Sequence, residues 1–262
     1  MIALISGFEP GEFWERLARC GERILLLDYD GTLAPFRVER DKAVPYAGIR
    51  EILNEIMESE QCRIVIVSGR WTKDLLPLLG LKRRPEIWGS HGIERLFPDG
   101  RYETVKLDKS IINALARVDS WAEDEQLQDR CERKPGSVAF HWRGLDRAQT
   151  DGLRSKVMKE WSDIATEAGL MLYEFDGGIE LRAPIRNKGD AVSTILSEAA
   201  PEGAVTAYLG DDLTDEDAFR AIKGKGIGVL VRKERRETEA DLWLKPPEEL
   251  LEFLKNWARA SM

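Results

Sequence analysis

The chain has 262 residues, of which 43% are hydrophobic and 33% are charged, and its formal net charge is −8. This length suits one large domain or two small ones with a real hydrophobic core. The acidic balance argues against general nucleic-acid binding, which needs a basic face, but it allows a local basic pocket for an anionic ligand.

The cysteines and the N-terminal sequence indicate which classes of protein are not expected. Cys20, Cys62 and Cys131 are scattered, which gives neither a disulfide framework nor a zinc motif. The N-terminal sequence lacks the charged region of a signal peptide, and no apolar segment is long enough to span a membrane. We therefore expect a cytoplasmic protein that has neither nucleic acid nor a membrane as a partner.

Strands and helices alternate over the first hundred residues. The pattern predicts, in order, a helix at 10–20, a strand at 24–27, a helix opened by Pro45, a strand at 63–67, a helix at 71–79 and a strand at 87–88. The strands are short apolar runs without alternation, which is typical of a parallel sheet covered by helices on both faces.

The pattern changes after an expected hairpin turn at residues 97–102. Two amphipathic helices around 111–122 and 153–168 and strands at 137–142, 170–175 and 179–182 follow, with a tight turn at Asp176-Gly177-Gly178. Such a mixture is typical of a small α+β unit. We expect it to be a domain at residues 104–184, inserted into a core made of residues 1–103 and 185–262.

The alternating rhythm resumes at Lys188. We expect a helix at 191–196, preceded by Lys188-Gly189-Asp190, then strands at 204–209 and 226–231 and a terminal helix opened by Pro246-Pro247. The charged run at residues 232–236 is interpreted as a solvated loop. The whole chain therefore predicts an α/β fold with an inserted α+β domain.

Two aspartates follow the first apolar strand, two positions apart. Asp28 and Asp30 would share a direction if the extended backbone continued, and they lie where open α/β sheets bind ligands. Two neighbouring carboxylates are unfavourable without a cation, so the pair suggests a hard divalent metal, with one carboxylate to attack and the other to move protons. The alternative is that both residues simply begin a turn, in which Asp and Gly are common.

Three more polar groups stand at predicted element boundaries. They are Ser68-Gly69-Arg70 after the second strand, Lys188 before a helix, and Asp211-Asp212 with Asp215 after a later strand. Acids for a cation, together with a hydroxyl and an ammonium for an anion, suit phosphoryl transfer. Singly, Ser68 could cap a helix and Lys188 could be a surface lysine, but all four pieces stand at predicted element boundaries.

This set resembles the motifs of the haloacid dehalogenase-like hydrolases, which implies their Rossmann-like core with an inserted cap of the α+β (C2) type. The resemblance implies that Asp28 is the nucleophile and forms an aspartyl-phosphate, and that Asp30 is the general acid and base. It also implies that Mg²⁺ binds Asp28, the carbonyl of Asp30, and Asp211. Asp212 and Asp215 would contact these ligands or reach the ion through water. Ser68, Gly69, Arg70 and Lys188 would hold the phosphoryl group.

The inserted segment is similar to that of the trehalose-6-phosphate phosphatases, and the resemblance covers residues 23–231. It rests on residues 89–92, 132–135, 141–143, 180–182 and 208–219. The resemblance implies that the cap grips the sugar of a sugar phosphate through Arg133, Lys134, His141, Arg143 and Glu180, with His91 from the core. Trp142, where the family has tyrosine, and Ala183 depart from its pattern.

The resemblance therefore implies a Mg²⁺-dependent phosphatase that converts trehalose 6-phosphate to trehalose and phosphate. Three alternatives stay open at this point. A phosphatase for another glycosyl phosphate, such as a glucosylglycerol, glycosylglycerate or pseudo-disaccharide phosphate, would share the core motifs. The cap side chains could instead lie on a solvated outer strand face, where Arg133 and Lys134 could pair with local acids. A non-catalytic sugar-phosphate-binding protein could also share the fold. The sequence does not indicate an oligomeric state.

Overall fold

A computed structural model describes residues 2–4, 9–175, 177–199 and 203–261. The chain divides into two compact units, one formed by Met1–Glu103 with Asn187–Met262 and the other by Thr104–Arg186. We call them the core unit and the inserted unit. The expected turn residue Asp176 lies outside the described residues.

The core unit is built on one mixed, mostly parallel sheet. In the described residues it has nine strands, in the order β1-β13-β12-β11-β2-β3-β4-β5-β6. Their bounds are β1 Ile2–Ala3, β2 Arg23–Leu27, β3 Cys62–Val67, β4 Glu86–Gly89, β5 Glu94–Leu96, β6 Tyr102–Thr104, β11 Val205–Gly210, β12 Ile227–Val231 and β13 Leu242–Leu244. The strands from β13 to β4 run parallel, so their carboxyl ends meet at one edge.

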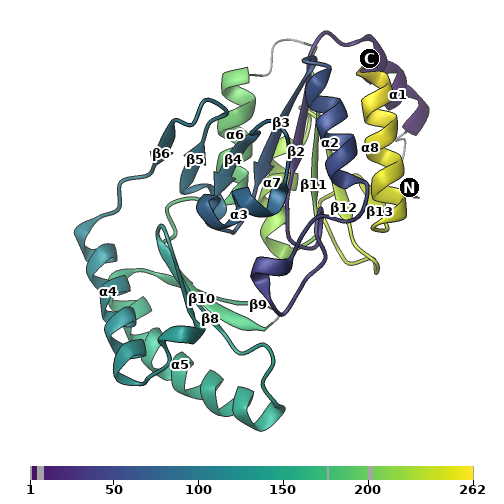
Figure 1. Cartoon of the computed structure of the whole chain (residues 1–262). Coiled ribbons are helices and arrows are strands. Elements are labelled where there is room, and N and C mark those ends of the chain that lie inside the picture. Colours follow the sequence, from purple (N-terminus) through teal and green to yellow (C-terminus); the bar gives the residue numbers. More distant parts are fainter. Residues whose placement is uncertain (1, 5–8, 176, 200–202, 262) are drawn as a thin grey trace. The chain divides into compact units, whose positions relative to one another are not determined.

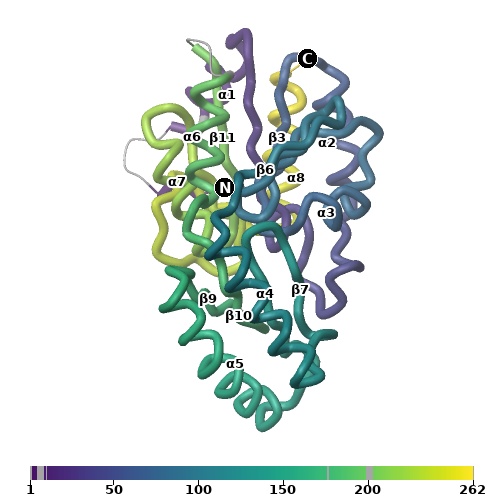
Figure 2. Tube along the Cα trace, turned by 90° about the vertical axis from the view of Figure 1, so that its left-hand side faces the viewer, coloured from purple at the N-terminus to yellow at the C-terminus, as the bar shows by residue number. Residues whose placement is uncertain are grey.

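Helices cover both faces of this sheet (Figures 1 and 2). The helices are α1 Pro10–Arg19, α2 Ile49–Glu58, α3 Thr72–Leu79, α6 Lys188–Ala199, α7 Glu216–Ile222 and α8 Glu248–Ala260. Leu25 and Leu27 of β2 pack in one cluster with α1, α2, α3 and α8, whereas Ile24 and Leu26 pack in a second cluster with α6 and α7. Alternate side chains of a strand point to opposite faces, which explains why both kinds of position are apolar here.

The inserted unit has its own sheet and its own core. The described strands β7 Cys131–Lys134, β8 Ser137–His141, β9 Met171–Phe175 and β10 Gly178–Arg182 form an antiparallel sheet in the order β7-β8-β10-β9. Helices α4 Lys109–Asp124 and α5 Arg147–Ala168 pack on one face through a cluster that includes Phe140 and Trp161. The α/β fold with an inserted α+β unit is therefore confirmed.

Two local expectations were wrong. Pro45 does not open a helix, because the N–H of Tyr46 bonds to the carbonyl of Leu33 and Gly48 adopts a φ of +86°. That left-handed conformation is incompatible with a helix, so α2 begins after it, at Ile49. The loop at residues 232–236 is not fully solvated, because the side chain of Arg236 is partly buried against the core unit.

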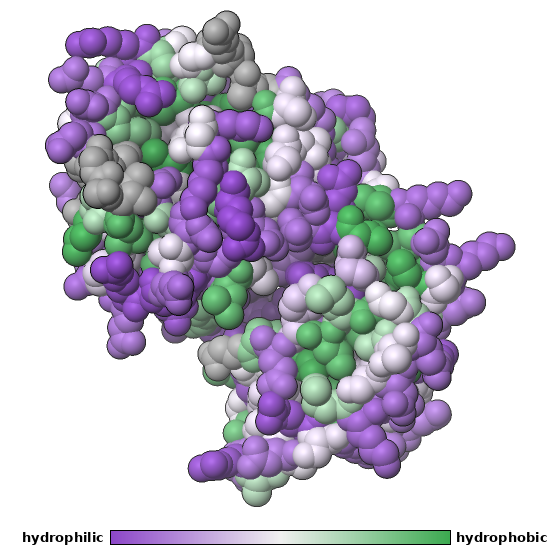
Figure 3. All heavy atoms as spheres, turned by 180° about the vertical axis from the view of Figure 1, so that it is seen from behind, coloured by the Kyte–Doolittle hydropathy of each residue, from purple (hydrophilic) through white to green (hydrophobic). Residues whose placement is uncertain are grey.

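Polar and charged side chains cover most of the face in Figure 3, with hydrophobic residues in small groups between them. In the described part of the chain, no helix is long and apolar enough to cross a membrane.

Candidate active site

The carboxyl ends of two neighbouring strands bring Asp28 and Asp211 together. Asp28 follows β2 and Asp211 follows β11, and these strands pair in parallel. The N–H of Asp28 continues the ladder by donating to the carbonyl of Leu209 at 2.9 Å. Parallel pairing at this edge therefore joins residues that lie far apart in the sequence.

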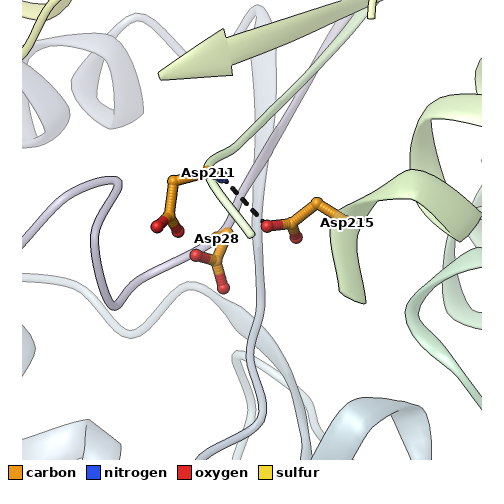
Figure 4. Close-up of side chains that lie close together, drawn as sticks. All are labelled: Asp28, Asp211 and Asp215. Carbon is orange, nitrogen blue, oxygen red and sulfur yellow. Dashed lines mark hydrogen bonds between the residues drawn. The ribbon is translucent and has the colours of Figure 1, made fainter. Parts of the chain in front are cut away.

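Asp28, Asp211 and Asp215 form a buried carboxylate cluster (Figure 4). They offer oxygens that lie within 4.8 Å of one another. Gly31 passes so close to this cluster that a Cβ atom there would lie 2.1 Å from an oxygen of Asp211. A glycine is therefore needed at position 31 for the backbone to approach Asp211, and its φ of +84° favours glycine as well.

Lys188 and Thr32 are the side chains that bind this cluster together. The Lys188 ammonium donates to Oδ1 of Asp28 and to Oδ1 of Asp215, both at 2.7 Å. The Thr32 hydroxyl lies 3.2 Å from Oδ2 of Asp28 and 3.4 Å from Oδ1 of Asp211. Because Lys188 is 3% exposed, it is not an ordinary surface lysine.

Asp215 differs from the other two aspartates in the number of bonds it accepts. Its Oδ1 accepts from Lys188 and from the Tyr208 hydroxyl, and its Oδ2 accepts from the backbone N–H groups of Asp211 and Asp212. A carboxylate has about four lone-pair sites, so those of Asp215 are in use. Asp28 and Asp211 are therefore the carboxylates left to offer oxygens to a cation, and such hard oxygens suit Mg²⁺.

The charges in the cluster are not balanced. Burial raises the pKa of the Asp28 carboxyl to about 7; the Lys188 ammonium opposes this rise and the Asp215 carboxylate adds to it. Burial, followed by the charge of Asp28, also raises the pKa of Asp211 well above its usual value. The pKa of Lys188 is raised against the effect of burial, because it lies between Asp215 and Asp28. Without a cation, the Asp28 and Asp211 carboxyls are therefore shifted toward their neutral forms, and a divalent cation bound between them would favour the ionised forms.

Ser68, Gly69 and Arg70 form a tight turn at the end of β3, which pairs with β2. The Ser68 hydroxyl accepts from the N–H of Arg70 at 3.1 Å, so it shapes the turn rather than capping α3, which begins at Thr72. His91 donates its backbone N–H to the carbonyl of Ser68, and its ring would lie 2.6 Å from a Cβ atom at Gly69. The Arg70 guanidinium donates to both oxygens of the Asp30 carboxylate. Asp212, another expected site residue, is half-buried in the loop after Asp211.

The inserted unit brings several of the expected sugar-binding residues to one face of its sheet. The pairing register places Lys134 opposite Ser137 and Glu180 opposite Ala139. The Lys134 ammonium pairs with the Glu180 carboxylate, which also accepts from the Ser137 hydroxyl at 2.8 Å. His141, on the same face of β8, lies 3.2 Å from Glu132. Arg143 follows β8 and lies against Gly177.

Arg133 lies on the other face. Side chains alternate along β7, and Arg133 pairs with Asp119 of α4 at 2.7 Å. Arg133 therefore pairs with an acid of its own unit, as the alternative interpretation of the sequence expected. Trp142 and Ala183 belong to the hydrophobic cluster of the inserted unit, so these two departures from the family pattern belong to its packing.

Thr32, Glu132 and Arg236 take part in these contacts but were not among the expected site residues. Thr32 lies in the motif at residues 28–32 and Glu132 in the motif at residues 132–135, so their places in these motifs could have identified them as site residues. Arg236 had none, because its partners include the backbone carbonyls of Asp211 and Asp212.

The fold is that of the haloacid dehalogenase-like hydrolases. A structure of such a hydrolase from B. subtilis superposes with a TM-score of 0.60 at 15% identity and covers 89% of this chain and 99% of its own. A model of the trehalose-phosphatase family matches residues 26–247, and the chain belongs to that family. This confirms the resemblance inferred from the sequence.

The relatives agree with this assignment. A trehalose-phosphate phosphatase of Mycobacterium marinum is 32% identical over 255 residues, which are 87% of this chain and 60% of the relative. The chain thus spans 60% of the length of that relative. The C-terminal domain of the C. albicans trehalose-6-phosphate phosphatase superposes with a TM-score of 0.80 at 23% identity and 99% coverage of both chains.

Proposed function

We propose that this protein is a Mg²⁺-dependent phosphatase that hydrolyses trehalose 6-phosphate to trehalose and phosphate. The observation that carries this proposal is the buried Asp28 at the end of β2, which is held by Lys188 and lies beside Asp211. Membership of the trehalose-phosphatase family supports the choice of substrate.

Asp28, Asp211 and the backbone carbonyl of Asp30 would hold the Mg²⁺ ion. The bound ion would neutralise charge on the phosphoryl group during transfer. Lys188, Ser68 and the turn at Gly69 and Arg70 would bind the phosphoryl oxygens. Asp215, whose acceptor sites are in use, would hold Lys188 and the Asp211–Asp212 backbone in place.

The reaction would take two steps. In the first, an Asp28 oxygen attacks phosphorus, the bond from phosphorus to the sugar oxygen breaks, and Asp30 donates a proton to that oxygen. In the second, Asp30 takes a proton from a water that attacks phosphorus, and the bond to Asp28 breaks to release phosphate and the free carboxylate. Because both oxygens of Asp30 accept hydrogen bonds from Arg70, the carboxylate must leave Arg70 and take up a proton from solvent before it can protonate the leaving oxygen.

The polar face of the inserted unit would recognise the sugar. Lys134, Glu180, Glu132 and His141 form pairs that can exchange partners with sugar hydroxyls, and Arg143 and His91 are further candidates. Charge-assisted hydrogen bonds of this kind are stronger than neutral ones, which suits selection among sugars. A different glycosyl phosphate remains the alternative substrate, because the core chemistry would be the same.

Phosphate release from trehalose 6-phosphate tests the proposal. Mg²⁺-dependent release should disappear in Asp28→Asn and in excess chelator, and Mg²⁺ should restore it to the chelated wild type. A panel of sugar phosphates should rank trehalose 6-phosphate first. Release that persists in Asp28→Asn would contradict the mechanism, and a poor rank for trehalose 6-phosphate would contradict the substrate.

A further inference from the structure

Arg236 lies in the charged loop after β12, and its side chain is directed back to the active site. The side chain is 16% exposed, although its neighbour Arg235 is exposed to solvent. Partial burial of one arginine in a charged run needs a compensating set of acceptors, because a guanidinium is costly to remove from water.

The acceptors are the backbone carbonyls of the loop that carries Asp211. Nη2 of Arg236 lies 2.7 Å from the carbonyl oxygen of Asp212 and 3.4 Å from that of Asp211. Nε lies 3.4 Å from the same Asp211 oxygen, and Nη1 donates to the carbonyl of Glu237 at 2.8 Å. The guanidinium thus binds two consecutive carbonyls, which the planar fork of arginine suits better than an ammonium.

Glu216 fixes the orientation of Arg236. The Glu216 carboxylate pairs with the guanidinium and is 12% exposed. It also accepts from the Thr238 hydroxyl at 2.9 Å and from the N–H of Glu239 at 2.7 Å. An ion pair that is ordered by further hydrogen bonds gives more directional control than an exposed pair.

The Asp211–Asp212 loop is therefore held from two sides by opposite charges. The carboxylate of Asp215 binds its two N–H groups, at 2.9 and 2.8 Å, and Arg236 binds its two carbonyls. These bonds include the peptide groups on both sides of Asp211, and fixing those two groups fixes the direction in which the Asp211 side chain leaves the backbone.

We propose that Arg236 is a positioning residue that holds Asp211 ready for the divalent cation. This inference rests on the proposed function, in which Asp211 is a metal ligand. Residues that orient metal ligands from behind contribute about 10- to 100-fold to metal affinity or activity. Arg236 would act in this way through the backbone of Asp211 rather than through its carboxylate.

Mg²⁺ binding to the full chain, measured by calorimetry without substrate, tests the proposal. Arg236→Gln should raise the Kd for Mg²⁺ about 10- to 100-fold. Arg236→Lys should fall between this variant and the wild type, since lysine keeps the charge without the fork. Arg235→Gln, which removes the same charge from the exposed neighbour, should leave the Kd unchanged.

A second measurement separates positioning from a merely structural role. Phosphatase activity of Arg236→Gln should recover toward the wild-type kcat at high Mg²⁺, whereas a damaged fold would lower kcat at every Mg²⁺ concentration. An unchanged Kd in Arg236→Gln would overturn the proposal. If that variant does not fold, Arg236→Lys and Glu216→Gln are judged by the same criterion. A wild type that binds no Mg²⁺ would instead overturn the proposed metal dependence itself.

Discussion

Arg70 holds both oxygens of the Asp30 carboxylate, with 2.6 Å from Nε to Oδ2 and 2.7 Å from Nη2 to Oδ1. A third bond joins Nη1 of Arg70 to the carbonyl of Arg40 at 2.9 Å. This two-pronged pair fixes a carboxylate that is 28% exposed and therefore reachable by a substrate. The pair thus fixes the orientation of the Asp30 carboxylate.

Asp30→Asn should lower steady-state hydrolysis of a sugar phosphate about 10²- to 10⁴-fold, because it removes the proposed proton donor and acceptor. An aryl phosphate should behave differently, since its leaving group needs no proton. We expect a rapid burst of phenolate followed by slow turnover, measured by stopped-flow absorbance. Asp41→Asn, an exposed aspartate in the same loop, is the matched control, and equal losses of burst and turnover would contradict the assigned role.

Lys188→Met should destabilise the core unit as well as abolish activity. The substitution leaves Asp28 and Asp215 buried without their shared cation, and loss of one partner of a buried ion pair costs about 3–5 kcal/mol. Urea unfolding in chelator should show this loss. Lys225→Met removes an exposed lysine and should not change the midpoint. A Lys188→Met protein as stable as wild type would mean that the ammonium does not compensate the two carboxylates.

Lys134→Met and Arg133→Met should show which face of the sheet in the inserted unit binds the sugar. Lys134 lies on the polar face with Glu180, whereas Arg133 pairs with Asp119. A lost hydrogen bond to a charged group costs about 1.5–3 kcal/mol, so Lys134→Met should lower kcat/KM for trehalose 6-phosphate about tenfold or more. Arg133→Met should keep the wild-type value, as should both variants with a small aryl phosphate. The reverse order would place the sugar on the other face.

Trp161→Ala should loosen the inserted unit while leaving the core unit intact. Trp161 is completely buried and meets Phe140 edge-on, with 6.3 Å between the ring centroids. Removing so large a core side chain costs about 3–5 kcal/mol. Hydrogen exchange should show lost protection within residues 104–186, and Ile112→Ala, at a half-exposed position, serves as the control. Equal loss of protection in the core unit would mean that the two units unfold together.

The core of the site was predictable because strand ends fix positions. An apolar run that stops at two aspartates predicts that Asp28 and Asp30 lie at the carboxyl end of a strand. A second apolar run that ends just before Asp211 predicts that Asp211 lies at the same edge of the sheet. Lys188 could be assigned only through its place among the motifs, since nothing local to it predicts burial. The structure brings Asp28, Lys188 and Asp211 together, and their chemical roles stay proposals.

Other features depended on contacts that the sequence does not encode locally. Arg236 looks like its charged neighbours in the sequence, yet its partners are Glu216 and backbone carbonyls, and any residue type can supply a backbone carbonyl. The face occupied by Arg133 depends on the register of β7, a strand that its polar sequence does not indicate. The start of α2 was set by the φ of Gly48 and the bond from Tyr46 to Leu33, which override the usual role of Pro45.

The four bonds to Asp215 also limit how position 215 can change over evolution. Asparagine would replace an acceptor oxygen with an NH₂ group, which would then face an ammonium, a hydroxyl or backbone N–H donors. Glutamate would keep the charge, but its extra methylene would have to fit where the side chain is already completely buried. Either replacement would therefore disturb these bonds or the packing around them, so we expect a change at position 215 to require further changes among its partners.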